Sequence, residues 1–144
     1  PIIGQVLQNT VDRLAILLRQ ARAAGTLVFA VQHDGASGHR LAQGSQDWKI
    51  RRKVAPLGGV IVINKSHSDA SYQTDLTAQL RTRGVTHLIV TGYMSQYCVD
   101  ITVRRAVDLG YVVTLVADGH GTSDDGALRH DQITAHHNIL VGKI

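Results

Sequence analysis

Two residues of this sequence could act together as a reactive pair: Cys98, the only cysteine, and Lys65. Cys98 follows the stretch "THLIVTGYM" and stands near the start of "SQYCVDITVRRAVDLG", whose apolar spacing predicts a helix that ends at Gly110. A thiol near a helix N-terminus lies close to the positive end of the helix dipole and to unpaired backbone N–H groups, which both stabilise a thiolate. Such a thiolate can attack a carbonyl group and form a covalent intermediate, while the N–H groups receive the oxyanion that develops.

Lys65 ends the apolar run "GVIVINK", which predicts a strand. If this strand lies beside the one that precedes Cys98, the lysine places a positive charge next to the thiolate. Each residue also has an ordinary structural interpretation, because a single cysteine is most often a small buried hydrophobe and a lysine after a strand usually faces solvent. The coincidence of the two positions favours the reactive pair.

Helical and strand-like patterns alternate along the chain. Helices are predicted for residues 9–25, with Asn9 or Thr10 as the cap, 74–84, 95–110 and 124–140. Short apolar runs predict strands at residues 27–31, 59–65, 86–92 and 111–119. The first has the pattern of a strand that is buried on both faces of a sheet, and the second is also expected to be buried. A long loop is predicted between residues 33 and 59. The alternation predicts a parallel sheet and a doubly wound α/β fold in one domain, residues 1–144.

In folds of this class, ligands bind beyond the carboxyl ends of the strands. Functional side chains are therefore expected just after Val31, Ile63, Val90 and Ala117. His33 stands at the first of these strand ends, where it could contact a substrate or serve as a core residue, and the sequence does not separate these two roles.

The composition limits the remaining functions. The chain has 44% hydrophobic and 18% charged residues, as globular proteins do, and no apolar run approaches the roughly 18 residues of a membrane span. One cysteine excludes an internal disulfide and indicates a reducing compartment, so we expect a cytoplasmic protein with no membrane partner. The net charge is +4, but the basic residues are scattered apart from the cluster at 51–53, so we expect no nucleic-acid partner.

The stretch "VTGYMSQYCVDITVRRAVDLGYVVTLVADGHGT" closely resembles the signature of the isochorismatase-like cysteine hydrolases, the family of the nicotinamidase-related amidases. In that signature a G-x-x-(Thr/Ser)-x-x-Cys-Val turn carries the nucleophile. The match continues upstream through "VINKSHSDASYQTDLTAQLRTRGVTHLIV", where the family has its catalytic lysine, and the resemblance extends from the first helix to "AHHN". It implies a three-layer α/β/α hydrolase that needs no cofactor and uses an aspartate, lysine and cysteine triad. The implied substrates are small amides, imides or related C–N compounds, or an enol ether.

The resemblance also implies roles for individual residues. Cys98 would be the nucleophile, and Lys65 would stabilise its thiolate and the developing charge. A cis peptide bond that is characteristic of the family would fall at Tyr93–Met94 and direct the N–H groups of Met94 and Cys98 into an oxyanion hole.

The sequence departs from the family at the triad aspartate, which lies at the end of a strand before the first helix. This sequence begins after that point, and Asp12, Asp34 and Asp118 occupy other places in the predicted fold, so no residue matches it. A sheet without this central strand would have two unpaired edges and an open core. We therefore expect the natural product to carry further upstream residues, on the order of 10–25, enough for one strand and its turn.

A second departure concerns the expected substrate pocket. Many family members have an aromatic residue in a "SAF" triplet shortly after the lysine, whereas this sequence reads "DAS", with Ser71 at the aromatic position and Tyr72 next to it. Tyr72 is therefore a candidate substrate contact, together with Tyr93. Trp48 in the long loop is another candidate, although it could equally be a tryptophan that packs the loop on the core.

The eight histidines raise the question of a metal. The nicotinamidase branch of the family binds zinc through an Asp-x-His arrangement after its second strand, and "QHDGASGHR" lacks that spacing here. Asp118 and His120 have the spacing at a different strand end, and His130 and His137 share a helix face of the kind found at surfaces or interfaces. We predict no metal and no other cofactor, because a zinc site needs at least three converging ligands.

Three functional classes stay open at this point. The first is a cofactor-free cysteine amidase that acts on a small molecule. The second is an inactive binding or scaffold module of the same fold, and the third is a zinc-dependent amidase of the nicotinamidase type. By resemblance, the chain is expected to form a homo-oligomer, a dimer or larger.

Overall fold

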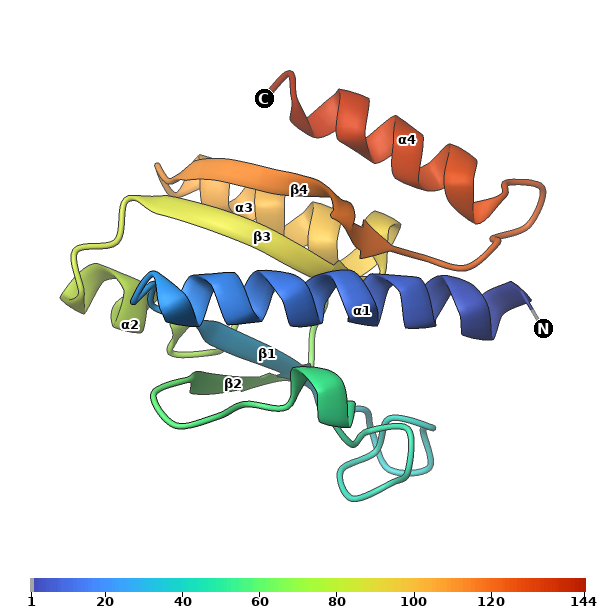
Figure 1. Cartoon of the computed structure of the whole chain (residues 1–144), viewed down its shortest axis with the longest axis horizontal. Helices are drawn as coiled ribbons and strands as arrows, with labels where there is room; N and C mark the ends of the chain where they lie inside the picture. Colours follow the sequence, from blue (N-terminus) through green and yellow to red (C-terminus); the bar gives the residue numbers. More distant parts are fainter. Residues whose placement is uncertain (1) are drawn as a thin grey trace.

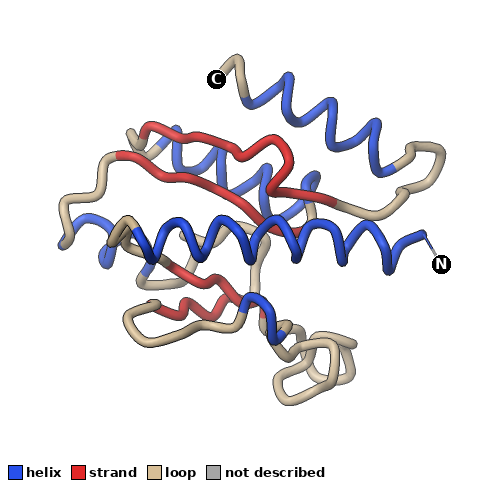
Figure 2. The backbone as a smooth tube through the Cα atoms, viewed as in Figure 1, coloured by secondary structure: helices blue, strands red, loops and turns tan. Residues whose placement is uncertain are grey.

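The computed structural model describes residues 2–144, with side chains from residue 5 onward. Figure 1 labels the elements, and Figure 2 colours them by type. The helices are α1 (Ile2–Ala23), α2 (Leu76–Thr82), α3 (Asp100–Asp108) and α4 (His130–Val141). The strands are β1 (Phe29–His33), β2 (Ile61–Lys65), β3 (His87–Tyr93) and β4 (Val112–Gly121). A short 3₁₀ turn, η1 (Arg52–Val54), and a π-helical turn, η2 (Ser95–Val99), complete the described chain.

The strands form two parallel pairs. β1 pairs with β2 from Phe29 opposite Ile61 to His33 opposite Lys65, and β3 pairs with β4. Between residues 2 and 144 no ladder of hydrogen bonds joins one pair to the other. Figure 1 shows α1 running between the two pairs, and α1 contacts β3, β4 and η1. The alternation of strands and helices and the parallel pairing confirm the predicted α/β class.

The expectation that the first two strands are buried was wrong. Val31 in β1 and Val62 in β2 are each 43% exposed. Each two-stranded sheet has open edges on both sides, so side chains near these edges contact fewer neighbours than they would in one continuous sheet.

The first helix begins earlier than expected. The sequence suggested a cap at Asn9 or Thr10, but α1 already begins at Ile2. Thr10 lies inside the helix, where its hydroxyl donates to the carbonyl oxygen of Val6 at 3.1 Å. This bond satisfies the hydroxyl group and leaves the helix uninterrupted. At the other end the prediction is confirmed, because Gly25 adopts a left-handed φ of 66° directly after the last turn.

The last helix begins later than expected. Residues 124–129 form a turn before α4 and are not part of it, since Asp125 and Leu128 pair in an isolated bridge. The carboxylate of Asp124 accepts the backbone N–H of His130 at 2.8 Å, so this acidic residue satisfies the helix start from outside. The first strand is likewise shifted by two residues, to Phe29–His33, and the long loop that follows contains η1 but is otherwise irregular (Figure 2).

Two groups of buried apolar side chains hold the elements in place. The first lies between α2 and the β1–β2 pair and contains Ile63, Ala70, Leu76 and Leu80. The second lies between η2, α3, α4 and the β3–β4 pair and contains Val99, Val103 and Val141. None of the helices in the described range is long and apolar enough to cross a membrane.

A large bulge interrupts the pairing of β3 with β4. Val90 lies opposite Leu115 and Gly92 lies opposite His120, so the residues from Val116 to Gly119 stand opposite Thr91 alone. The bulge needs a glycine at position 119, because a Cβ atom there would lie 2.9 Å from Val116 and 3.2 Å from Thr91. This bulge directs the end of β4 towards the turn that follows β3.

We predict that Gly119→Ala lowers the free energy of unfolding by about 1–3 kcal/mol, because the new methyl group overlaps Val116. Gly58→Ala is the matched control, since nothing lies within 4 Å of a Cβ atom at that position. Urea denaturation followed by circular dichroism measures both variants. Equal stability of the two variants would show that the bulge is not packed as described.

Candidate active site

Lys65 and Cys98 meet in the folded chain. The Nζ atom of Lys65 lies 3.2 Å from the Sγ atom of Cys98. Lys65 is 6% exposed and Cys98 is half-buried. The residues come from different strand pairs, since Lys65 ends β2 and Cys98 lies in η2 after β3. The structure thus brings together the two residues that the sequence indicated as a reactive pair.

The loop after β2 surrounds the Lys65 ammonium group with oxygen atoms. The ammonium donates to the carbonyl oxygens of His67 at 2.7 Å and Ser68 at 3.3 Å. Thr102 in α3 holds this loop, because its hydroxyl accepts the backbone N–H of Ala70 at 3.0 Å and donates to the Ser68 carbonyl at 3.4 Å. The loop that orients the lysine is therefore attached to the helix that continues from Cys98.

Cys98 lies in a π-helical turn and not in a regular α-helix, which the sequence pattern had predicted from residue 95 onward. The turn follows a cis peptide bond between Tyr93 and Met94, where the family resemblance placed one. The carbonyl oxygen of Met94 accepts the N–H groups of Tyr97 at 3.2 Å and Val99 at 3.3 Å. The described backbone hydrogen bonds include none donated by the Met94 amide.

His33 lies beside the lysine. Its Nδ1 atom is 3.4 Å from the Lys65 Nζ atom, and because an ammonium group only donates, Nδ1 accepts and the ring proton lies on Nε2. Burial, and then the positive charge of Lys65, lower the pKa of His33 below its usual value. His33 is therefore neutral near pH 7, and its Nε2–H group is a hydrogen-bond donor next to the reactive pair.

Trp48 and Tyr72 lie near the same strand ends. The Trp48 indole donates to Asp34 at 2.6 Å, and Asn64 donates to the same carboxylate at 3.1 Å, so the long loop is attached to the ends of β1 and β2. Tyr72 packs edge-on against His67 with ring centroids 4.8 Å apart. No hydrogen bond in the described chain joins Trp48 or Tyr72 to the reactive pair.

One buried polar group was not assigned to the site from the sequence. Ser95 is fully buried, and its hydroxyl lies 2.8 Å from Nδ1 of His120, which is 4% exposed. The only sequence signal was the position of His120 after a strand, where the spacing suggested a comparison with metal ligands. The structure instead directs its ring toward Ser95, at the start of the turn that contains Cys98.

The histidines do not gather with other ligands. Among residues 2–144, no group of three or more His, Cys, Asp or Glu side chains could hold a metal ion. Asp118 pairs with Arg13 at 3.4 Å while His120 contacts Ser95, and His130 contacts Asp124 at 2.8 Å. That the protein acts without a metal stays a prediction.

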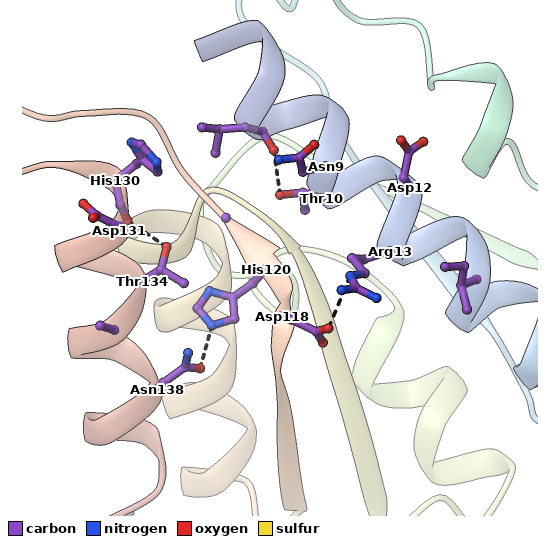
Figure 3. A pocket seen from close by; sticks show the side chains of 14 residues that line it. Asn9, Thr10, Asp12, Arg13, Asp118, His120, His130, Asp131, Thr134 and Asn138 are labelled. Atoms are coloured by element: carbon purple, nitrogen blue, oxygen red, sulfur yellow. Dashed lines mark hydrogen bonds and ion pairs between the residues drawn. The ribbon is translucent and has the colours of Figure 1, made fainter. Parts of the chain in front are cut away.

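A cavity of about 740 Å³ lies between α1, the end of β4 and α4 (Figure 3). Its lining includes Arg13, Asp118, His120, His130 and Asn138. Lys65 and Cys98 are not among the residues that line it, so the cavity is separate from the reactive pair. His120 lines the cavity and also contacts Ser95, which lies in the same turn as Cys98.

Comparison with known proteins identifies the family of the chain. The isochorismatase domain matches residues 5–138. A streptothricin hydrolase of Streptomyces noursei is 40% identical over 116 residues, which cover 81% of this chain and 42% of that protein. The ureidoacrylate amidohydrolase RutB of Variovorax paradoxus is 28% identical, over 77% of this chain and 56% of that protein. The crystal structure of an isochorismatase from Pseudomonas putida has a TM-score of 0.84 at 33% identity, and the match covers 95% of this chain and 71% of that chain.

The chain belongs to the isochorismatase family, a family of hydrolases, and has its α/β fold. It spans about half the length of the curated relatives described above, 42% of one and 56% of the other.

Substitution of Lys65 tests whether its ammonium group activates the thiol. We predict that Lys65→Met, which keeps the length of the side chain and removes its charge, slows alkylation of Cys98 by iodoacetamide at pH 7 about tenfold. The exposed Lys49→Met is the control and leaves the rate unchanged. Intact mass spectrometry over time gives the rates, and equal rates for the two variants would contradict the assignment.

The half-buried His33 and the buried His120 make stability depend on pH. Burial lowers the pKa values of His33 and His120 from 6.5, so folding favours their neutral forms. The free energy of unfolding should therefore fall as the pH drops below 6.5, and it should level off below the folded-state pKa values. Urea midpoints measured at pH 7.5 and 5 test this, and His120→Gln should lose less stability over this interval than the unsubstituted chain. A larger loss in the variant would contradict the burial argument.

Proposed function

We propose that this protein is a cysteine hydrolase that cleaves an amide or related C–N bond of a small molecule without a cofactor. The observation that carries the proposal is the 3.2 Å contact between the Lys65 ammonium group and the Cys98 sulfur. A buried ammonium group at this distance favours the thiolate, because the two opposite charges attract in a region of low dielectric constant.

In the proposed reaction, the Cys98 thiolate attacks the carbonyl carbon of the substrate. A carbon–sulfur bond forms while the carbonyl π electrons move to the oxygen, and the amide groups of Met94 and Cys98 donate to this oxyanion. The intermediate then collapses, so the C–N bond breaks and the amine leaves with a proton. Water attacks the resulting thioester, which releases a carboxylic acid and restores the thiol.

The amine needs a proton donor that this sequence does not assign. In the family the triad aspartate has a place beside the lysine, and no residue here matches it. Within the described chain, no carboxylate oxygen forms a hydrogen bond with Lys65, whose ammonium group contacts carbonyl oxygens, His33 and Cys98. The protonation of the leaving amine is therefore assigned to none of the residues that contact Lys65.

The substrate would lie beyond the ends of β1, β2 and β3, against His33, Trp48, Tyr72 and Tyr93. His33 offers an N–H donor, and the aromatic side chains offer flat apolar surfaces. Such a surface fits a small polar molecule with one planar group. The name of the ureidoacrylate amidohydrolase supports hydrolysis of an amide C–N bond, and the name of the streptothricin hydrolase supports hydrolysis as the reaction class.

An inactive binding module of the same fold is the second candidate. It would be favoured if the full-length protein also had no carboxylate beside Lys65, because the resemblance implies an aspartate in the family's reaction. The cytoplasmic location and the assembly into a homo-oligomer also stay predictions, and size-exclusion chromatography with light scattering would measure the oligomeric state.

A hydrolysis assay tests the proposal. We expect the full-length protein to release ammonia or an amine from at least one member of a panel of small primary amides, cyclic imides and ureido acids. Cys98→Ser should lower kcat by more than about a thousandfold while the fold is kept. EDTA should leave the rate unchanged, and a loss of activity with EDTA would favour a zinc-dependent amidase instead. Binding of panel members without turnover would favour the inactive module.

A further inference from the structure

A chain of three side chains, of which Ser95 and His120 are buried and Asn138 is half-buried, connects the nucleophile turn η2 (Ser95–Val99) to the last helix. Ser95, the first residue of η2, contacts Nδ1 of His120 at 2.8 Å, and Nε2 of His120 contacts Oδ1 of Asn138 at 2.9 Å. Figure 3 shows the His120 ring between β4 and α4, with the dashed line to Asn138. Ser95 is fully buried and His120 is 4% exposed, so the Ser95–His120 contact is shielded from water.

The hydrogen-bond partners fix where the protons lie. The Asn138 amide nitrogen donates to the carbonyl oxygen of Ala117 at 3.1 Å, which leaves the Asn138 oxygen facing His120. Nε2 of His120 must therefore donate, and a neutral imidazole then has Nδ1 as its acceptor. The Ser95 hydroxyl donates to this atom. Burial favours the neutral ring, because it lowers the pKa of His120 more than the Asn138 contact raises it.

The contact depends on the bulge in β4. The bulge shifts the pairing so that His120 lies opposite Gly92, directly before the turn that carries Met94 and Cys98. The carbonyl oxygen of Ala117, which lies in the bulge, accepts a hydrogen bond from the Asn138 side chain of α4. The same asparagine thus holds the bulge and orients the histidine.

We propose that His120 is a positioning residue, which fixes Ser95 and thereby holds the nucleophile turn so that the Cys98 sulfur stays against the Lys65 ammonium group. Cys98 follows Ser95 by three residues in the same short turn, and the Met94 carbonyl closes that turn through Tyr97 and Val99. A displacement of Ser95 would therefore move the sulfur away from a partner that lies only 3.2 Å from it. The effect on hydrolysis rests on the proposed function, whereas the effect on the thiol does not.

Alkylation of Cys98 tests the proposal without a substrate. We expect His120→Leu and Ser95→Ala each to slow the reaction with iodoacetamide at pH 7 about tenfold and to shift its pH profile upward. Because His120 acts through Ser95, the double variant should be no slower than either single variant. His136→Leu, an exposed histidine of the same helix α4 as Asn138, is the control and should keep the original rate.

A role in packing alone predicts a different result. It would lower the urea midpoint of His120→Leu and leave the alkylation rate of the folded protein unchanged, and that outcome would overturn the proposal. Additive effects in the double variant would overturn it as well. If His120→Leu does not fold, Ser95→Ala and Asn138→Leu decide the question, since slower alkylation in both supports positioning and unchanged rates refute it.

Hydrolysis separates this inference from the proposed function. On an accepted amide, His120→Leu should lower kcat about tenfold and change KM less than about twofold, because the nucleophile and not the substrate pocket is displaced. If the unsubstituted protein hydrolyses nothing while the alkylation pattern holds, the proposed function fails and the positioning role stands.

Discussion

The contact between the Lys65 ammonium group and the Cys98 sulfur is the interaction on which the geometry of the site depends. It joins the β1–β2 pair to the turn after β3, although no ladder of hydrogen bonds joins the two strand pairs between residues 2 and 144. A buried ammonium group is costly unless its N–H donors are satisfied, and two carbonyl oxygens, a neutral histidine and the sulfur satisfy them here. The same contacts fix the direction in which the lysine points.

The surroundings of this pair are built from both halves of the chain. Thr102 ties the carbonyl loop after β2 to α3, and Trp48 ties the long loop to the ends of β1 and β2 through Asp34. On the other side, His120 of β4 and Asn138 of α4 form a chain of hydrogen bonds to Ser95 in the turn that contains Cys98. The sulfur and the ammonium group are thus each positioned by a separate set of hydrogen bonds.

The sequence predicted the parts of this site that depend on local pattern. The periods of apolar residues located the four strands, although β1 and β4 each end two residues later than predicted. Parallel strands place their carboxyl ends together, so Lys65, Cys98 and His33 could be expected to meet. The motif around Cys98 also identified the family, which the isochorismatase domain match confirms.

The remaining features depend on contacts between distant residues. The Ser95–His120 bond exists because a bulge sets Val116–Gly119 opposite one residue, and no periodic pattern records such a register shift. The cap expected at Asn9 or Thr10 was wrong because a threonine hydroxyl can bond to the preceding helical turn as well as to a helix start, and Thr10 donates to the Val6 carbonyl. The attachment of Trp48 to Asp34 likewise requires a loop closure that residue types alone do not determine.

The central claim is that Cys98 forms a covalent bond to the acyl group of a substrate, and trapping this intermediate tests it most directly. An accepted amide would be mixed with the full-length protein, quenched in acid within the first turnover, and digested for peptide mass mapping. The account predicts that the peptide carrying Cys98 gains the mass of the acyl group, and that Cys98→Ser shows no such thioester. Turnover of the amide with no acyl group on Cys98 at any quench time, together with activity retained in Cys98→Ala, would contradict it.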